Sequence, residues 1–370
     1  AMRKGVTRAL PLLALFSFAC ADSAQPAAAP GNPVDPPKQN EDLAAMMNGS
    51  ASAADASKAS DPAEAKKAEE AKKLAEDFAK LDKEQATEKA RMSETLRKDL
   101  ATLNDKKFPN FKAALEASLK SAHRTPGAAD RDKERHPVEL LSFFKLDTKM
   151  SVLELDAGGG WYTELLAPVL KKNGKLTVTG PNPDGAMTAR PTYYGKRLRG
   201  FLDKAPELGE KVDYLVADPE AGLVIPDDKK GTFDAVLSFR NLHGWQNRNV
   251  LDKNLTAVFD ALKPGGYLGV EAHRAKPGAD PKESGKKGYL PEAYVIERAE
   301  AAGFKLDAKS EINANPKDTA DHPEGVWTLP PTLRLGDKDK EKYLAIGESD
   351  RMTLRFIKPK TPAKAPAKKP

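Results

Sequence analysis

The chain has 370 residues, a net charge of +6 and a single cysteine, which excludes a disulfide within one chain. Five of the lysines lie, without any acid, between residues 358 and 370, so the rest of the chain carries a net charge of only +1. Because a nucleic-acid-binding protein is expected to concentrate positive charge on its fold, nucleic acid is not an expected partner.

The first 21 residues have the composition of a signal peptide. Basic residues at positions 3, 4 and 8 precede an uncharged apolar stretch, Ala9–Ala19, which is too short to cross a bilayer as a helix. Cys20 follows where a bacterial lipoprotein precursor carries its acylated cysteine, although Ala19-Cys20-Ala21 also fits an ordinary cleavage site. We therefore expect an exported protein that a lipid on Cys20 anchors to the membrane, facing the periplasm.

Two further segments precede the alternating pattern of strands and helices. Residues 22–60 are rich in Ala, Pro, Ser and Gly and indicate a disordered linker. Residues 61–122 are rich in Ala, Lys and Glu, with apolar side chains three and four apart, such as Leu74, Phe78 and Leu81. This spacing predicts an amphipathic helix or helix pair, either a bracing segment with a solvated face or a coiled-coil partner site.

Beyond Arg124, strands alternate with helical segments, as in an α/β protein with a mostly parallel sheet. The predicted strands are 150–155, 175–179, 212–217, 233–239, 267–273, 305–312 and 351–357. The helix before the fifth strand ends at 262–266, Leu-Lys-Pro-Gly-Gly, where proline and glycine break it. Asn313–Asp350 is too long for a hairpin loop and is typical of a lid or substrate-side insertion. Residues 359–370 indicate a basic, disordered tail.

The segment from Met150 to Thr163 predicts a buried strand that enters a glycine-rich turn and opens a helix. We expect the three glycines at 158–160 to leave a slot beside the first strand for a nucleoside cofactor. Thr163 replaces the third glycine of a dinucleotide fingerprint, and the Gly-Lys-Ser/Thr of a phosphate-binding loop is absent. What remains is an acid-x-x-x-Gly-x-Gly pattern that begins at Glu154.

This pattern resembles motif I of the class I S-adenosylmethionine-dependent methyltransferases, and the turn at 262–266 is a second feature of that family. From about His123 to Pro359 the chain is similar to one bacterial group of predicted class I methyltransferases. The supporting stretches are 131–132, 135–137, 158–164, 239–245, 262–266, 271–274 and 310–319. The resemblance implies a Rossmann-like seven-stranded sheet with helices on both faces over residues 123–358, preceded by the helical segment.

The resemblance also implies S-adenosyl-L-methionine as the cofactor. Glu154 would then orient its methionine end, and Gly158 and Gly160 would pass beside it. Asp218 would contact the adenine amine. The full set predicted to bind the cofactor is Glu154, Asp156, Gly158, Gly160, Tyr162, Asn182, Asp218 and Asn241.

Two positions depart from the family pattern. The second strand ends in Thr-Gly-Pro-Asn at 179–182, where relatives carry an acid that binds both ribose hydroxyls, and Asp184 lies further along. Asp156 stands where many relatives have the first glycine. Its carboxylate would approach the carboxylate of the cofactor, an unfavourable contact unless the side chain turns away.

Methyl transfer is an in-line displacement, so alignment of the reacting atoms and exclusion of water provide most of the catalysis. An aromatic face suits a sulfonium, and we expect Tyr162, Trp161 or Trp245 to supply it or else to pack in the core. The alignment that this chemistry needs is expected at the carboxyl edge of the sheet, where open α/β sheets bind ligands.

Two histidines follow strands at that edge. His243 comes after the fourth strand and His273 ends the fifth, so we predict that they act as a general base or orient the acceptor. Arg274 is predicted to act with them, and Arg240 could also hold an anionic substrate. The alternative partners of these arginines are the acids Glu271 and Asp132.

A metal site is the other reading of these side chains. Glu271 and His273 are two apart on a strand and share a face, so they could ligate a metal together with His243. No dense cluster of ligand residues accompanies them in the sequence, so we expect no metal.

The sequence thus leaves two functional hypotheses. The first is methyl transfer from S-adenosylmethionine to a small-molecule acceptor that remains unidentified. The second is a non-catalytic envelope lipoprotein that uses the same fold for ligand binding or structure, because an export signal and a cytoplasmic cofactor are mismatched. The predicted partners are a small molecule and the membrane, and the oligomeric state is left open.

Overall fold

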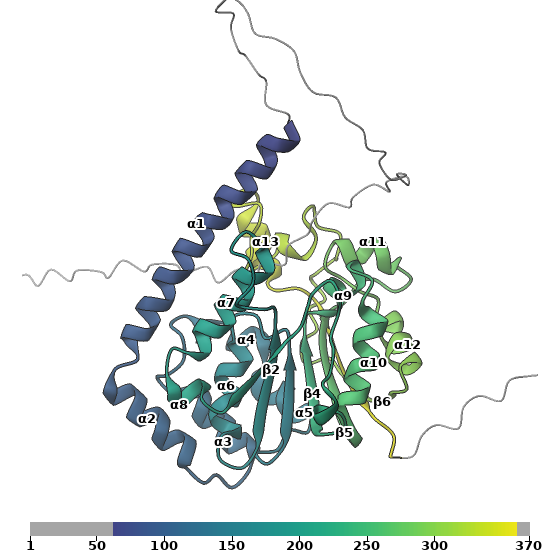
Figure 1. The fold of residues 1–370 in the computed structure, drawn as a ribbon. Coiled ribbons are helices and arrows are strands. Elements are labelled where there is room, and N and C mark those ends of the chain that lie inside the picture. Colours follow the sequence, from purple (N-terminus) through teal and green to yellow (C-terminus); the bar gives the residue numbers. More distant parts are fainter. Residues whose placement is uncertain (1–61, 361–370) are drawn as a thin grey trace, which may run out of the picture.

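A computed structural model describes residues 62–360; the predicted signal peptide, Cys20, the linker and the tail beyond Lys360 lie outside the described residues. Figure 1 shows a central sheet covered by helices, with one long helix standing at its side. Among residues 62–360, no helix combines the length and the hydrophobicity needed to cross a bilayer.

Seven strands form one sheet in the order β3-β2-β1-β4-β5-β7-β6. Their bounds are β1 Ser151–Leu155, β2 Lys175–Gly180, β3 Val212–Val216, β4 Phe233–Phe239, β5 Leu262–His273, β6 Lys305–Ser310 and β7 Arg351–Ile357. The first five strands pair in parallel, and β7 lies antiparallel between β5 and β6. The predicted seven-stranded α/β sheet is confirmed, although β5 begins before the predicted residue 267 and β6 ends before residue 312.

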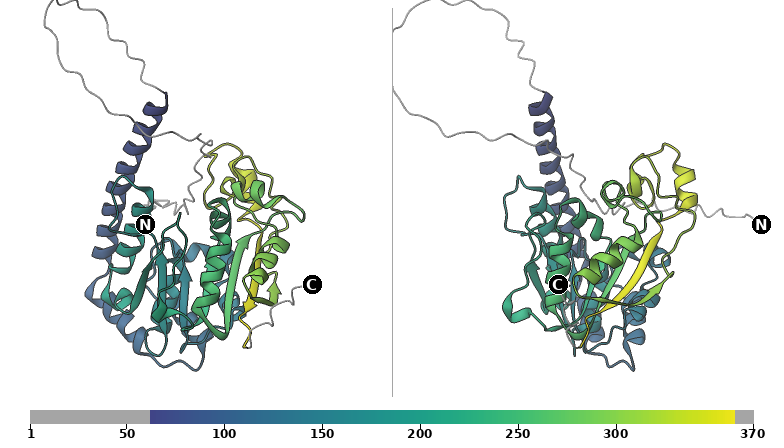
Figure 2. Two further views of the ribbon diagram at one scale, coloured as in Figure 1. Left: turned by 45° about the vertical axis from the view of Figure 1, so that its right-hand side comes forward. Right: turned by 90° about the vertical axis from the view of Figure 1, so that its right-hand side faces the viewer.

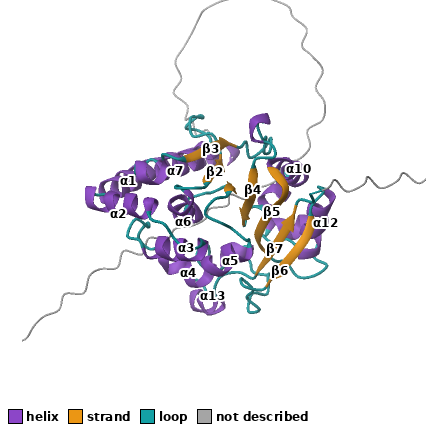
Figure 3. Cartoon of the chain, turned by 90° about the horizontal axis from the view of Figure 1, so that it is seen from below, coloured by secondary structure: helices purple, strands orange, loops and turns teal. Residues whose placement is uncertain are grey.

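The sheet separates two hydrophobic cores, because successive side chains on a strand point to opposite faces. Val152 belongs to the core that contains residues of α3 (Phe111–Lys120), α5 (Pro137–Phe143) and α6 (Trp161–Leu170). Leu153 belongs to the other core, with residues of α10 (Leu251–Ala261) and α12 (Glu292–Ala301). Figure 3 shows these two helical layers on either side of the sheet.

The helical segment forms α1 (Pro62–Arg91), α2 (Glu94–Asp105) and α3. The apolar side chains of Leu74, Phe78 and Leu81 are buried. Phe78 packs edge-on against Tyr193 of α7 (Arg190–Leu202), with ring centroids 5.6 Å apart. The domain itself therefore covers this apolar stripe and α1 acts as a brace, while residues 63–73 are exposed and extend past the sheet (Figure 2).

A buried ion pair fastens the brace to the sheet domain. Lys204 Nζ lies 2.6 Å from Glu164 Oε1 of α6 and 3.6 Å from Glu88 Oε2 of α1. The ring of His123 adds a 2.9 Å hydrogen bond between its Nε2 and the carbonyl oxygen of Glu164. Because α1, α6 and the end of α7 meet at this cluster, the helical segment and the sheet pack as one unit.

Shorter helices complete the fold. They are α4 (Asp132–Arg135), α8 (Pro206–Gly209), α9 (Leu242–Asn247), α11 (Pro281–Lys286) and α13 (Lys340–Ile346), with short 3-10 helices at Ala128–Arg131, Asp227–Lys229 and Gly325–Thr328. The stretch between β6 and β7 contains the 3-10 helix Gly325–Thr328 and α13. Figure 2 shows this insertion in yellow above the carboxyl end of β5.

Candidate functional site

A crevice lies at the carboxyl ends of β1, β2 and β3, next to the point where the strand order reverses between β1 and β4. Open α/β sheets bind ligands at such a position. It is lined by Leu155, Asp156, Thr179, Ala217, Asp218, Pro219, Leu223, Trp245, Arg248 and Asn254. The space within it, with open solvent included, is about 280 Å³, so the crevice as it stands does not enclose a ligand of nucleotide size.

The glycine loop does not leave the slot that the sequence predicts. A side-chain carbon placed on Gly159 would lie 2.8 Å from Arg197 Nη2, and one on Gly160 would lie 2.4 Å from the Phe201 ring. Both of these neighbours belong to α7, so Gly160, at φ 81°, allows helix packing. At Gly158 the nearest atom is 3.8 Å away. The expected slot over Gly159 and Gly160 is therefore filled by the protein, and the crevice lies elsewhere, beside Asp156.

Glu154 faces α6 because strand alternation puts it on the same side of the sheet as Val152. Its carboxylate accepts a 2.7 Å hydrogen bond from the hydroxyl of Thr163, and the side chain is buried. Burial raises the pKa of Glu154 to about 8, against the opposing effects of Thr163 and Arg135. Glu154 does not line the crevice, so its predicted role at the methionine end of the cofactor stays a prediction.

Asp156 is one of the residues that line the crevice. Its backbone has φ 45°, a left-handed conformation that is uncommon for a residue with a side chain. Its N–H donates a 2.8 Å hydrogen bond to Thr179 Oγ1, and its Oδ2 accepts one of 2.8 Å from Trp245 Nε1 of α9. Of the three aromatic side chains considered for the sulfonium, Trp245 is the one that lines the crevice.

Three other residues predicted to bind the cofactor form hydrogen bonds within the protein. Asp218 lines the crevice, and the backbone N–H groups of residues 220 and 221 donate to its Oδ1, which lowers its pKa. Asn182 Oδ1 accepts a hydrogen bond from the N–H of Asp184. Asn241 Nδ2 donates to the carbonyl oxygen of Leu155 over 2.8 Å and so ties the end of β4 to the end of β1. Asn182 and Asn241 do not line the crevice.

Tyr162 lies in the core rather than in the crevice. Its ring stacks on Phe239 with centroids 3.6 Å apart, and its hydroxyl donates a 3.4 Å hydrogen bond to Glu271 Oε2. Trp161 Nε1 donates to the carbonyl oxygen of Ala128. Both rings therefore pack within the protein, which is the alternative to a sulfonium contact that the sequence analysis names.

The two predicted histidines do come together. The ring centroids of His243 and His273 are 5.8 Å apart, and Trp327 of the insertion lies 5.9 Å from His243. His273 Nδ1 shares a 2.6 Å hydrogen bond with Ser349 Oγ. Burial, His243 and the neighbouring arginines hold the pKa of His273 well below its usual range, so this imidazole is neutral at pH 7.

A buried ion cluster lies beside these rings. We define it as Arg131, Arg240, Glu271, Glu348 and Arg351. Glu271, at the end of β5, accepts a hydrogen bond from Arg240 over 3.1 Å and forms an ion pair with Arg351 at 3.0 Å. Burial opposes ionisation of Glu271, but the two arginines outweigh it and lower its pKa. The salt bridge from Arg240 to Glu271 is one of the alternatives that the sequence analysis names. Arg351 and Glu348 are not predicted from the sequence, because they join this cluster only through the pairing of β7 with β5.

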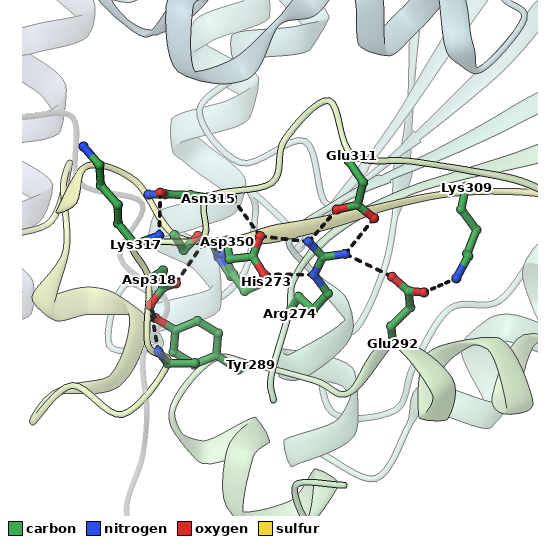
Figure 4. A network of polar contacts seen from close by, with 12 residues as sticks. His273, Arg274, Tyr289, Glu292, Lys309, Glu311, Asn315, Lys317, Asp318 and Asp350 are labelled. Carbon is green, nitrogen blue, oxygen red and sulfur yellow. Dashed lines mark hydrogen bonds and ion pairs between the residues drawn. The ribbon is translucent and has the colours of Figure 1, made fainter. Parts of the chain in front are cut away.

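Arg274 holds the insertion to β5 (Figure 4). Its guanidinium contacts Asp350 at 2.9 Å, Glu311 at 2.7 Å and Glu292 at 3.3 Å. Asp318, also from the insertion, accepts hydrogen bonds from Tyr289 and from the backbone N–H of Asp350. Arg274 is thus paired with three carboxylates, and its predicted catalytic role stays a prediction.

Within residues 62–360, no group of three or more His, Cys, Asp or Glu side chains is arranged to hold a metal ion. Glu271 is paired with arginines and His273 with Ser349, which is not the arrangement that the metal alternative requires.

Comparison with known proteins identifies one family model, described as a methyltransferase domain, which matches residues 153–270. This stretch runs from β1 to β5 and contains the crevice residues. No curated protein matches the chain.

Solved structures with a similar arrangement include three methyltransferases. A SAM-dependent methyltransferase from Aquifex aeolicus is 16% identical, with a TM-score of 0.41 over 68% of this chain and 100% of that one. A putative sarcosine dimethylglycine methyltransferase from Galdieria sulphuraria is 14% identical, with a TM-score of 0.42 over 66% and 91%. A glycopeptide N-methyltransferase complexed with S-adenosyl-L-homocysteine is 16% identical, with a TM-score of 0.36 over 60% and 86%.

The low TM-scores add nothing to the fold assignment, which rests on strand order and on the family match. Residues 153–270 therefore match a methyltransferase domain, and they lie within a Rossmann-like seven-stranded sheet.

Proposed function

We propose that this protein transfers a methyl group from S-adenosylmethionine to a small-molecule acceptor. The observation that carries the proposal is the coincidence of the family match at residues 153–270 with a crevice at the carboxyl ends of β1, β2 and β3. When bound, S-adenosylmethionine supplies the methyl group as an electrophile. The protein then has to bind the nucleoside, align the acceptor and exclude water.

The crevice has the groups that the nucleoside half of this cofactor requires. Asp218 and the adjoining backbone at Ala217 suit the adenine edge, and the Trp245 ring offers an aromatic face. The place expected for the methionine half is more restricted, since Arg197 and Phe201 occupy the space over the glycine loop. We therefore assign the nucleoside to the crevice.

The acceptor side of the proposal rests on the histidine pair. His243 and His273 follow neighbouring strands, and the Trp327 ring covers them from the insertion. Neutral His273 can orient an oxygen or nitrogen nucleophile through a hydrogen bond, although its lowered pKa makes it a weak base. Trp327 and His243 are buried, whereas His273 is partly exposed.

A thermal unfolding assay of the full chain with S-adenosylhomocysteine tests the proposal. Ligand at about 100 times its dissociation constant should raise the free energy of unfolding by about 2.7 kcal/mol. Adenosine triphosphate, which shares the nucleoside but not the amino-acid end, serves as the comparison ligand. The absence of stabilisation by both S-adenosylmethionine and S-adenosylhomocysteine would contradict the proposal.

A second candidate is ligand binding or a structural role without turnover. It is favoured by the filled space over Gly159 and Gly160 and by the burial of Glu154 away from the crevice. Under this hypothesis, S-adenosylhomocysteine neither stabilises the protein nor accompanies it through purification.

We also propose that the chain is exported and anchored through Cys20, as the basic residues and the apolar stretch before it suggest. Detergent partitioning of cell fractions tests this. The wild-type protein should enter the detergent phase, and Cys20→Ser should remain in the aqueous phase. Equal partitioning of the two proteins would contradict lipidation.

A further inference from the structure

We propose that Asp156 replaces the acid missing from the end of β2 and accepts hydrogen bonds from the two ribose hydroxyls of the nucleoside. This inference rests on the proposed function, because it specifies how the same crevice recognises the sugar. It also reverses the expectation that this carboxylate hinders the cofactor.

The first observation is position. Asp156 follows β1, yet the N–H of Asp156 donates to Thr179 Oγ1 over 2.8 Å, and the N–H of Ala157 donates to the carbonyl oxygen of Thr179 over 3.1 Å. Both bonds hold the start of the glycine loop against the end of β2. The backbone of Asp156 therefore lies beside the strand end where the family pattern places its acid, and Asp156 lines the crevice together with Thr179.

The second observation is orientation. Trp245 Nε1 donates to Asp156 Oδ2 over 2.8 Å, and the backbone of Asp156 holds φ 45°. A side chain at such a φ costs free energy, and strain of this kind is concentrated at functional sites. The fold thus holds this carboxylate in one direction, and it lines the crevice with Trp245.

The third observation concerns the residues that line the crevice together with Asp156. Asp156 and Asp218 are the two acids among the crevice residues, and Ala217 lies between the strand end and Asp218. With Asp218 at the adenine, Asp156 lies where a sugar attached to that adenine would follow. A carboxylate accepts hydrogen bonds from vicinal hydroxyls, and such charge-assisted bonds are stronger than those between neutral groups.

The other candidates for the sugar are less suitable. Asn182 Oδ1 already accepts the N–H of Asp184 over 3.0 Å, and neither side chain lines the crevice. Both residues are exposed. Thr179 Oγ1 is engaged as the acceptor for Asp156.

Calorimetric titration of the full chain tests the proposal with three ligands: S-adenosylhomocysteine, adenosine, and an adenosine analogue that lacks both vicinal ribose hydroxyls. Asp156→Asn should weaken S-adenosylhomocysteine and adenosine by about 10- to 100-fold, as expected for hydrogen bonds to a charged group. Its affinity for the analogue should equal that of the wild type. That equality also shows that the variant is folded at the crevice.

Asp156→Gly and Asp184→Asn complete the design. Asp156→Gly, which restores the glycine of the family pattern, should also lose affinity, whereas Asp184→Asn should not. Tighter binding by Asp156→Gly would show that the carboxylate obstructs the crevice, and a loss confined to Asp184→Asn would assign the sugar to that residue. Either result overturns the inference while the proposed function stands. If the wild type binds no S-adenosylhomocysteine, that result contradicts the proposed function, and therefore also the inference that rests on it.

Discussion

At the carboxyl edge of the sheet, a crevice lies beside β1, β2 and β3, whereas the edge at β4, β5 and β7 is filled by the buried ion cluster and the insertion. In the crevice, Asp156 accepts a hydrogen bond from Trp245 and donates one to Thr179. In the ion cluster, Glu271 is fully buried between two arginines. One half of the edge therefore has space beside its strand ends, whereas the other half is filled by paired charges.

The largest effect is expected in the ion cluster. Glu271→Ala leaves Arg240 and Arg351 buried without the carboxylate between them, so the free energy of unfolding should fall by about 3–5 kcal/mol. Urea unfolding measures the loss. Glu94→Ala, which removes an exposed ion pair with Lys98, is the control and should change little. Equal losses in the two variants would show that the cluster is not structurally important.

Gly160→Ala sharpens the distinction between packing and binding in the glycine loop. The added carbon would meet Phe201, so the variant should lose about 1–3 kcal/mol of stability through overpacking. Gly231→Ala is a matched control, because Gly231 also has a positive φ, 64°, but has no atom within 4 Å of the added carbon. If the two variants are equally stable, the contact between Gly160 and Phe201 is not tight.

Glu154 gives a pH-dependent prediction. Because its pKa is raised to about 8 in the folded protein, the folded state holds a proton that the unfolded state has lost above about pH 5. The contribution of this residue to stability therefore falls as pH rises, up to about pH 8. Glu154→Gln should remove that decline, so the stability that the variant gains on the wild type should grow with pH over this range. Thermal unfolding across pH measures it, and a difference that does not depend on pH would refute the assignment.

The smallest effect concerns the aromatic wall of the crevice. Trp245→Phe keeps a ring but loses the hydrogen bond to Asp156, and S-adenosylhomocysteine should bind about 5-fold more weakly, which corresponds to about 1 kcal/mol. Trp161→Phe, which loses a hydrogen bond to Ala128 away from the crevice, should bind as the wild type does. Similar weakening in both would indicate a general loss of packing.

The strand pattern and the carboxyl-edge position of His243 and His273 could be predicted because strand alternation and chain order are local properties of the sequence. The filled space over the glycine loop could not be predicted from the sequence. Arg197 and Phe201 belong to α7, which follows the next strand, and no local pattern places them against the loop. The ion cluster was missed for the same reason: Glu271 and Arg351 are distant in sequence and meet only through the antiparallel pairing of β5 and β7. Asp156 was identified as a departure, but its hydrogen bond to Trp245 depends on the course of α9.

The central claim is that a nucleoside cofactor occupies the crevice while the ion cluster stays closed. Hydrogen exchange of the full chain, with and without saturating S-adenosylhomocysteine, tests it most directly. The account predicts slower amide exchange at residues 155–160 and 216–223 and little change at residues 346–353. Protection confined to 346–353, or no protection anywhere, would contradict it.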